Sequence, residues 1–573
     1  MLVAVLGLGC CSLVVRAIDL QYLDKAFYQQ QGDARFLRDL PMAVSRGMIT
    51  DRHGEPLAVS SPVESIWVNP QELLPEPDRL GDLAAALAID EPVLRDRIEQ
   101  RAEREFVYLR RGMNPDDAQA ILALEIPGVY SQREFRRFYP QGEVMAHVLG
   151  FTNIDEHGQE GLELAFDSWL AGTEGTKRVI RDRRGHIVEN VDLIRAPQPG
   201  RDLRLSIDKR LQYLAFRELK HALLENRAAS GSVVVLDIRN GEILAMVNQP
   251  SYNPNARDGS AVDARRNRAI TDVFEPGSVI KTFTVAAALE TGRVRPDTQI
   301  ETSPGFITVG GHTINDIHNY GTVTTTRLLT KSSNVAAIKL AMDMPSEHLH
   351  DVLRRFGFGA ATGSGFPGEA AGVLTAPQGW GTLEKATISF GYGLSVTALQ
   401  LAQAYAAIGN GGQMVTPTFL HGTPPQSRAV IDPDIAAQLM AMLETVTGSE
   451  GTAKTAAVPG FRTAGKTGTS RRAVAGGYQK RYISSFAGLV PASQPRFAAV
   501  VILNDPTGGA YYGGSVAAPV FGRMMEGALR VMDVPPDRVD QWLAAVPPSQ
   551  TPVSPDAAAE AVPDLPQVMR GRP

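Results

Sequence analysis

Cysteine is nearly absent from this chain of 573 residues, which has only Cys10 and Cys11, next to each other near its start. Beyond that pair, no intramolecular disulfide and no thiolate metal site can form. Two neighbouring cysteines inside an apolar run are most simply small hydrophobic residues. The lack of cysteine elsewhere suits an extracytoplasmic domain, where a free thiol is prone to oxidation.

A marked excess of charge of either sign is also absent. The chain has 57 Lys and Arg against 62 Asp and Glu, a formal net charge of −5, and no basic block dominates it. This balance argues against a nucleic-acid-binding protein. Hydrophobic residues make up 43% of the chain, which permits sizeable cores. The length suits about three or four domains.

The first residues form a short apolar run without a basic flank. Residues 1–15 carry no charge, and Arg16 then interrupts the run. A spanning helix needs about 20 apolar residues, and the cytoplasmic flank of such a helix is usually basic. We interpret residues 1–23 as an uncleaved membrane anchor. A cleaved signal peptide is a second reading that lacks its basic start and its Ala-x-Ala site; a lipoprotein signal ending at Cys10 is a third.

The region 24–202 alternates between helical and strand patterns and shows no pattern of site chemistry. We predict a mixed α/β pedestal here. The expected elements, in chain order, are an amphipathic helix over 19–40, a hairpin over 46–58 with its turn at 51–55, helices within 71–126, an extended stretch over 130–140, a helix over 161–172, and two strands within 176–191 around a turn at 183–185.

The region 203–544 has strand patterns at both ends and helices between them. Strands this far apart in the chain can share one sheet, so we predict an α+β fold in which an antiparallel sheet is flanked by helices. The tail 545–573 is rich in Pro and Ala and is predicted to be disordered. The expected elements are a helix over 208–226, strands over 231–237, 243–247, 480–490 and 497–503, and a closing helix over 516–530.

The stretch 274–282 is the first candidate for chemistry. It stops at Pro276-Gly277 and then opens a helix that is apolar around most of its circumference up to Gly292, so we expect that helix to be buried. Ser278 lies in its first turn and Lys281 three residues on, so the hydroxyl and the amine can meet on one face. Burial favours the neutral amine, which can take the proton of a serine. The N–H groups at a helix start favour an oxyanion.

Two further motifs follow in the chain. Ser332-Ser333-Asn334 precedes an apolar helical run, and Lys466-Thr467-Gly468-Thr469 lies further on. The hydroxyl of Ser332 could pass a proton between a lysine and a leaving group. Each motif alone is weak, because a helix cap or a turn after an edge strand explains it equally well. Ser-x-x-Lys, Ser-x-Asn and Lys-Thr-Gly in this order are typical of penicillin-recognising serine acyltransferases.

The last two motifs also suit the handling of a peptide. On a strand, Lys466 and Gly468 share one face, and Thr467 and Thr469 share the other. Another backbone can approach closely at Gly468, because that residue has no side chain, and an extended peptide could pair along this edge. Asn334 offers both a donor and an acceptor to an amide.

These motifs and several others give the chain a resemblance that extends over nearly its whole length. It resembles the class B penicillin-binding proteins, and most of all their division-specific D,D-transpeptidases from Gram-negative bacteria. The resemblance implies a penicillin-binding fold on a dimerisation-like pedestal, in a single-pass protein of the inner (cytoplasmic) membrane whose bulk is periplasmic. The other stretches that carry it are Arg46–Gly54, Gly161-Leu162-Glu163, Pro250–Asn255, Phe274–Gly277 and Ser389–Gly393.

The resemblance also implies roles for the motif residues. Ser278 would attack the penultimate D-Ala of a stem peptide, with Lys281 as general base. The backbone N–H groups of Ser278 and Thr469 would form an oxyanion hole. The resemblance further implies proton transfer by Ser332 and Lys466, amide binding by Asn334, and binding of the terminal carboxylate by Thr467 and Thr469. Tyr511 and Tyr512 would form a wall of the site, although they could equally belong to a Gly-rich aromatic hairpin.

The implied ligands and partners are peptidoglycan stem peptides, β-lactam antibiotics, and a polytopic glycan polymerase with other division proteins in the membrane. The resemblance implies no cofactor, no metal and no nucleic acid. The alternatives are an elongation-type class B transpeptidase, a D,D-carboxypeptidase, and a non-catalytic division scaffold or β-lactam sensor. A class A β-lactamase is disfavoured, because Glu369 is followed four positions on by Val373 rather than by Asn.

Two other patterns suggest different chemistry. His312, Asp316 and His318 could indicate a metal, but no further ligand accompanies them. Residues 460–467 fit the spelling of a phosphate-binding loop, which should open a helix. The polar run after Thr469 is a poor helix start, so we interpret this match as chance.

Overall fold

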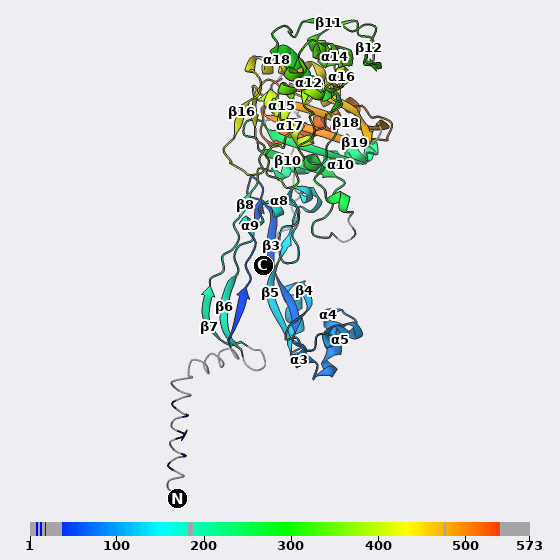
Figure 1. Cartoon of the computed structure of the whole chain (residues 1–573). Helices are drawn as coiled ribbons and strands as arrows, with labels where there is room; N and C mark the ends of the chain where they lie inside the picture. The colour runs from blue at the N-terminus through cyan, green and yellow to red at the C-terminus, as the bar shows by residue number, and fades with distance from the viewer. Residues whose placement is uncertain are drawn as a thin grey trace, which may run out of the picture.

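The structure, a computed structural model, describes residues 37–538 except 182–186, 258, 260 and 475–476, and a few isolated positions between 7 and 18. A two-legged pedestal carries a larger head (Figure 1). None of the helices in this part of the chain combines the length and the hydropathy of a membrane crossing. The anchor predicted for residues 1–23, the turn at 183–185 and the tail 545–573 lie wholly or largely outside the described residues.

One leg of the pedestal is a three-stranded antiparallel sheet in the order β1-β6-β7. The prediction of a helix as far as residue 40 is wrong at its described end, because β1 pairs with β6 from Leu37 opposite Ile180 to Met42 opposite Gly175. Pro41 is tolerated there, since β1 is an edge strand. The two strands predicted within 176–191 are confirmed. The bounds are β1 Leu37–Met42, β6 Gly175–Arg181 and β7 Ile187–Arg195.

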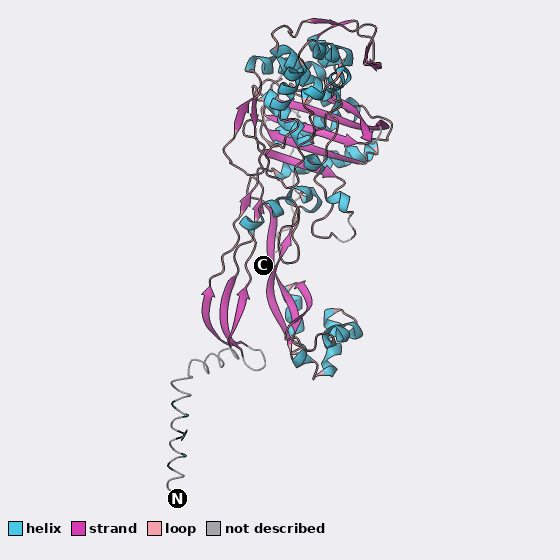
Figure 2. Cartoon of the chain, in the orientation of Figure 1, coloured by secondary structure: helices cyan, strands magenta, loops and turns pink. Residues whose placement is uncertain are grey.

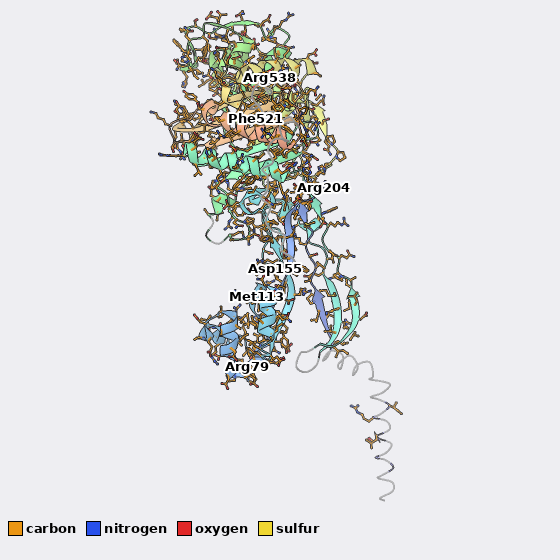
Figure 3. All side chains as sticks on the ribbon, turned by 180° about the vertical axis from the view of Figure 1, so that it is seen from behind. Arg79, Met113, Asp155, Arg204, Phe521 and Arg538 are labelled. Atoms are coloured by element: carbon orange, nitrogen blue, oxygen red, sulfur yellow. The ribbon has the colours of Figure 1, made fainter. Side chains whose placement is uncertain are left out.

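The other leg packs β3, β4 and β5 against short helices around a separate small core that includes Ile66, Leu83 and Leu94. Met113 and Arg79 belong to this lobe (Figure 3). The helices predicted within 71–126 and the extended stretch at 130–140 are confirmed. Residues 107–113 form a strand that was not predicted. The bounds are β3 Pro56–Val68, α3 Pro70–Leu73, η2 Pro77–Arg79, α4 Leu80–Leu87, α5 Glu91–Glu99, β4 Val107–Met113, α6 Pro115–Leu122 and β5 Val129–Phe138.

A buried ion-pair network holds the top of the pedestal together. Arg46 donates to Glu163 at 2.7 Å and to Asp167 at 2.7 Å, and Arg137 donates to the other oxygen of Glu163 at 2.6 Å. Both arginines and Glu163 are buried, so removal of one partner would leave an uncompensated charge. The predicted hairpin at 46–58 is confirmed. The bounds are β2 Ile49–Thr50, η3 Gly142–Val144, α7 Ala146–Leu149, α8 Gly161–Ala165, α9 Asp167–Leu170 and β8 Leu203–Arg204.

The stretch Pro250–Asn255 joins the pedestal to the head. The side chain of Asn255 accepts from the N–H of Tyr139 and donates to its carbonyl, both at 2.9 Å. The hydroxyl of Tyr252 donates to the carbonyl of Ala146 at 3.1 Å. One hydrophobic core runs from the pedestal residues Ile49 and Leu149 into the head. The pedestal and the head therefore meet through packed side chains as well as through the chain itself.

The head is organised around a five-stranded antiparallel sheet in the order β10-β9-β19-β18-β17, seen in Figure 2 between helices. The sheet unites segments more than 200 residues apart, as predicted, and β17 is an edge strand. The bounds are β9 Ser230–Asp237, β10 Ile243–Gln249, β17 Ala464–Val474, β18 Gly477–Val490 and β19 Phe497–Asn504.

Helices cover both faces of this sheet. On one face, a Cβ at Gly231 would lie 2.9 Å from Leu223 of α10, and one at Gly488 would lie 2.7 Å from the ring of Phe521 of α20. On the other face, Leu489 contacts Gly409 of α17. Because neither face meets water, every residue of β9 is buried, and β19 is apolar from Phe497 to Leu503. The bounds are α10 Lys209–Asn226, α17 Ala398–Gly409 and α20 Ala518–Val531.

The rest of the head is mainly helical and stands beyond the β17 edge of the sheet. Its central helix α12 is buried at every residue from Lys281 to Leu289, as its composition predicts. The main bounds are α11 Arg268–Thr271, η5 Gly277–Ile280, α12 Lys281–Glu290, α13 Thr325–Lys331, α14 Asn334–Met342, α15 Ser346–Arg355, α16 Thr382–Ile388, α18 Pro433–Thr447 and α19 Gly513–Val516, with the strand pairs β11 Gln299–Glu301 with β14 Thr322–Thr324, β12 Phe306–Val309 with β13 His312–Asn315, and β15 Gln413–Val415 with β16 Ser427–Ala429.

His147, at the junction of pedestal and head, should make folding sensitive to acid. Its Nε2 donates to the carbonyl of Ala264 at 2.9 Å, which fits the neutral ring. Burial lowers the pKa of His147 to about 4, whereas the unfolded chain titrates near 6.5. The unfolded state therefore binds the extra proton, and the free energy of unfolding falls by up to about 1.4 kcal/mol per pH unit as pH drops from about 6.5 to 4.

Urea unfolding of the parent and of His147→Gln across pH 4–8 measures this contribution. The variant should have a shallower loss of stability between pH 6.5 and 4 than the parent, because glutamine keeps a donor and takes up no proton. Parallel curves for the two proteins would show that His147 does not contribute.

Candidate active site

A cleft of about 1070 Å³ lies between the edge strand β17 and the helical part of the head. It brings together most of the residues that the sequence singled out, from segments more than 200 residues apart. Lys281 and Lys466 are fully buried beside it. The predicted residues in its wall are Ser278, Ser332, Asn334, Thr467, Thr469, Tyr511 and Tyr512.

Ser278 lies in η5, a short 3-10 helix that leads directly into α12. Among the described residues its side chain takes part in no hydrogen bond. We expected the hydroxyl of Ser278 to meet the amine of Lys281, but the two form no hydrogen bond in this structure. The amine of Lys281 is directed at Ser332 instead. Its Nζ lies 2.5 Å from the carbonyl oxygen and 3.2 Å from the Oγ of Ser332.

The hydroxyl of Ser332 is shared by two lysines. Lys466 reaches the same Oγ from β17, at 2.9 Å from its Nζ. Ser332 has a left-handed backbone, with φ of 61°, at the end of α13. The next residue, Ser333, caps α14 by accepting from the N–H of Ala336 at 3.0 Å. Because Ser333 does the capping, the hydroxyl of Ser332 remains available to the lysines.

Burial makes both lysines weaker bases than usual. It lowers the pKa of Lys281 to about 7, and the carboxylate of Asp316 opposes part of that shift. Burial, followed by the positive charge of Lys281, holds the pKa of Lys466 well below its usual value. At neutral pH a sizeable fraction of Lys281 is therefore the free amine, which is the form that can accept a proton.

Asp316 fixes the Ser332–Asn334 loop. Its carboxylate accepts from the hydroxyl of Ser333 at 2.6 Å and from the N–H groups of Asn334 and Val335. The metal reading of this segment gains no support: no group of three or more His, Cys, Asp or Glu within the described ranges could hold a metal ion. The sequence did not reveal this role, because the contact spans 17 residues and follows no local pattern.

Two glycines hold the turn that carries Ser278. A Cβ at Gly391 would lie 2.0 Å from the carbonyl oxygen of Gly277, and the N–H of Gly277 donates to the carbonyl of Gly391 at 3.0 Å. On the other side, a Cβ at Gly468 would lie 2.8 Å from the carbonyl oxygen of Pro276. The close backbone approach expected at Gly468 thus comes from this protein's own turn.

The threonines of β17 face the cleft and have partners of their own. Thr467 and Thr452 share a hydrogen bond of 3.0 Å between their hydroxyls, and Thr469 accepts from the N–H of Gly513 at 3.0 Å. Tyr511 stacks on Tyr482 at 4.0 Å between ring centroids and on Tyr512 at 4.6 Å. The two predicted tyrosines thereby form a continuous aromatic side of the cleft.

Several residues of the site were not assigned a role in it from the sequence. Glu275 accepts from the N–H of Gly393 at 2.8 Å and from the hydroxyl of Tyr478 at 3.0 Å, which ties the turn before Ser278 to the β17–β18 hairpin. Other lining residues that sequence reasoning missed are His312, Ile314, Ile317, Thr387, Phe390, Tyr392, Arg471 and Tyr482.

Two competing patterns have plain structural explanations. Residues 460–467 lead into the strand β17 rather than into a helix, so their phosphate-loop spelling is chance. Glu369 accepts from the N–H of Thr362 at 2.7 Å and from the hydroxyl of Ser364 at 3.1 Å, and it does not line the cleft. The site therefore has no water-activating carboxylate at that position.

Comparison with known proteins gives two family matches. Residues 231–526 match the family model described as "Penicillin binding protein transpeptidase domain", and residues 41–205 match the one described as "Penicillin-binding Protein dimerisation domain". The first match alone covers more than half of the chain.

Curated relatives match over nearly the whole length. Peptidoglycan D,D-transpeptidase FtsI of Escherichia coli (strain K12) is 46% identical over 537 residues, which cover 92% of this chain and 91% of the relative. Probable peptidoglycan D,D-transpeptidase PbpC of Pseudomonas aeruginosa is 43% identical over 526 residues, which cover 91% of this chain and 93% of the relative.

Solved structures agree in fold. Penicillin-binding protein 3 of Mycobacterium tuberculosis, complexed with aztreonam, is 29% identical with a TM-score of 0.68 and covers 87% of this chain and 98% of its own. The TP domain of Burkholderia pseudomallei penicillin-binding protein 3 is 41% identical with a TM-score of 0.54. The match covers 58% of this chain and 97% of that domain's chain.

The clamp on the turn that carries Ser278 predicts that Gly391→Ala lowers the free energy of unfolding by more than a left-handed backbone alone explains. Gly391 has a φ of 92° and no room for a Cβ, whereas Gly292 has a φ of 70° and no atom within 4 Å of a built Cβ. We expect Gly292→Ala to lower the free energy of unfolding by about 1–2 kcal/mol and Gly391→Ala by about 3 kcal/mol or more, because the turn must also move. Urea unfolding measures both variants, and equal losses would contradict the clamp.

Proposed function

This chain belongs to the class B penicillin-binding proteins, and on that premise we propose that it is a peptidoglycan D,D-transpeptidase that works through an acyl-enzyme on Ser278. The observation that supports it most directly is the shared hydroxyl of Ser332, which lies within 3.2 Å of the amines of both Lys281 and Lys466. We further propose that the chain divides into an anchor (1–23), a pedestal (24–202), a transpeptidase domain (203–544) and a tail (545–573).

In the first step, the Oγ of Ser278 forms a bond to the carbonyl carbon of the penultimate D-Ala of a stem peptide. Its proton passes to the free amine of Lys281. The bond to the terminal D-Ala then breaks, and the leaving nitrogen receives a proton through Ser332 from the lysines. Terminal D-Ala departs as the amino acid, and the stem remains as an ester on Ser278.

The cleft walls hold the stem peptide for this step. Thr467 and Thr469 bind the terminal carboxylate, and Asn334 binds the amide before the scissile bond. The backbone N–H groups of Ser278 and Thr469 stabilise the oxyanion. The side chains of Thr467, Thr469 and Asn334 all line the cleft beside Ser278, which supports these roles.

In the second step, an amine from a neighbouring stem attacks the ester carbonyl. The amine loses its proton by the same Ser332 route, the Oγ of Ser278 regains one, and an amide crosslink replaces the ester. A β-lactam acylates Ser278 in the same way, but its leaving nitrogen stays attached to the acyl group. The adduct therefore persists.

We assign this activity to septal wall synthesis. The Phe274–Gly277 lead-in and the motif spacing favour the division-specific members of the family over the elongation-type ones. The protein then acts from the inner membrane with its bulk in the periplasm, beside a polytopic glycan polymerase and other division proteins.

Acylation of Ser278 is the first prediction of this function. Intact-protein mass of the described part of the chain after mixing with benzylpenicillin should increase by the mass of one penicillin, and Ser278→Ala should show no increase. The adduct on the parent should last for hours, because the carboxylate of Glu369 does not line the cleft and so cannot activate a water there. An equal adduct on the variant, or none on the parent, would overturn the assignment of the nucleophile.

The pH dependence of acylation should report the amine of Lys281. Its pKa is about 7, and only the neutral form accepts the proton of Ser278. The second-order rate constant for acylation should therefore increase about tenfold per pH unit below pH 7 and level off above it. Stopped-flow measurements with a chromogenic cephalosporin test this, and a rate that is flat from pH 5 to 9, or one that still rises at pH 9, would rule out Lys281 in this role.

A further inference from the structure

A second cavity, of about 420 Å³, lies behind the active-site cleft. It is formed where α11 and the segment after it pass over the ends of β9, β17, β18 and β19. This volume falls within the range of small-molecule sites, about 300–1000 Å³. Its apolar lining consists of Ala229, Val273, Phe274, Ala398, Ala473, Ile483 and Ile502. Its polar lining includes Arg268, Asp272, Glu275, Arg471, Arg472, Asn504 and Asp505.

The cavity and the cleft share a wall. Arg471 and Tyr482 line both of them. On the cleft side, the ring of Tyr482 stacks on Tyr511 at 4.0 Å. Glu275, which lines the cavity, lies three residues before Ser278. A molecule in the cavity would therefore contact both the segment that leads to Ser278 and the aromatic side of the cleft.

The charges of the cavity indicate what it would hold. Arg268 is paired with Asp272 at 3.1 Å, and Asp505 is paired with Arg481 at 2.5 Å. Arg471 and Arg472 form no ion pair with any residue in the described ranges. One carboxylate oxygen of Glu275 accepts from Gly393 and Tyr478 in the shared wall, and its other oxygen is buried without a hydrogen-bond partner among the described residues. Two exposed guanidinium groups without an ion pair, next to an apolar floor, suit a carboxylate attached to an apolar body.

We propose that this cavity is a second ligand site, which takes a small organic carboxylate with an apolar body, and that its occupation changes the rate at which Ser278 is acylated. The carboxylate contacts Arg472 and Arg471, and the apolar body lies on Phe274, Ile483 and Ile502. The coupling passes through Tyr482 and through the segment before Ser278. The second half of the proposal rests on the function proposed above, and the first half does not.

Calorimetric titration with 2-naphthoate, and with its neutral counterpart 2-naphthamide, tests the site directly. The acid should bind at least tenfold more tightly than the amide. Arg472→Gln should weaken the acid about tenfold, and Ala473→Trp, from an exposed position in the cavity wall, should abolish binding. Arg530→Gln removes an exposed arginine of α20 and should bind 2-naphthoate as the parent does. Equal affinities for acid and amide, or for the parent and Arg472→Gln, would overturn the site.

Two further measurements separate the cavity from the cleft. Enzyme first acylated with benzylpenicillin should still bind 2-naphthoate, and loss of binding would place the ligand in the cleft instead. Saturating 2-naphthoate should change the acylation rate of the parent at least twofold and leave that of Arg472→Gln unchanged. An unchanged parent rate with intact binding would overturn the coupling. Failure of the parent to be acylated at all would refute the proposed function and leave the binding result standing.

Discussion

The active site depends on one constraint, which is that two fully buried lysines meet at a single hydroxyl. Two ammonium groups at 0% exposure would repel each other and would lack water, so the low-energy state has at least one free amine. That requirement gives the amine of Lys281 a pKa of about 7, so that it can act as a base near neutral pH. It also fits the burial of α12 from Lys281 to Leu289, since the burial of Lys281 is what lowers its pKa.

The second constraint is that three separate segments must hold their backbones almost in contact. The turn with Ser278 fits between Gly391 on one side and Gly468 on the other. The sheet supplies the rigidity for this, because β17 is paired along its length with β18, which is itself paired with β19. The pattern of glycine near the motifs thus reflects distances between main chains rather than flexibility.

The pedestal is joined to the head by contacts that involve no chemistry at the site. Arg46 and Glu163 lock the upper pedestal, and Tyr252 and Asn255 bind it to the head through hydrogen bonds to backbone groups. Asn267, just before α11, donates to the carbonyl of His147 in the pedestal at 3.2 Å. The segment that follows α11 leads to Ser278, so the pedestal contacts the element that positions this serine.

The sequence by itself was enough for the elements whose cause is local. The helix over 208–226, four of the five strands of the central sheet (β9, β10, β18 and β19) and the buried helix after Ser278 follow from periodicity and from glycine and proline stops. The order of the three motifs was likewise enough to indicate the family and its chemistry. The prediction was wrong at residues 37–40 and missed the strand at 107–113. Both segments are short, and each is a strand because it pairs with another strand that is distant in the chain.

Only the tertiary structure decided how the motif residues meet. The sequence placed Ser278 and Lys281 on one helix face, yet the amine turns to Ser332, because a loop held by Asp316 brings that hydroxyl within reach. The hydrogen bond from Ser333 to Asp316, the clamp on Gly277 by Gly391 and the wall shared by the two cavities are likewise contacts between segments that no local pattern connects. Local patterns encode backbone conformation, whereas the partner of a buried polar group depends on which distant segment the folded core places beside it.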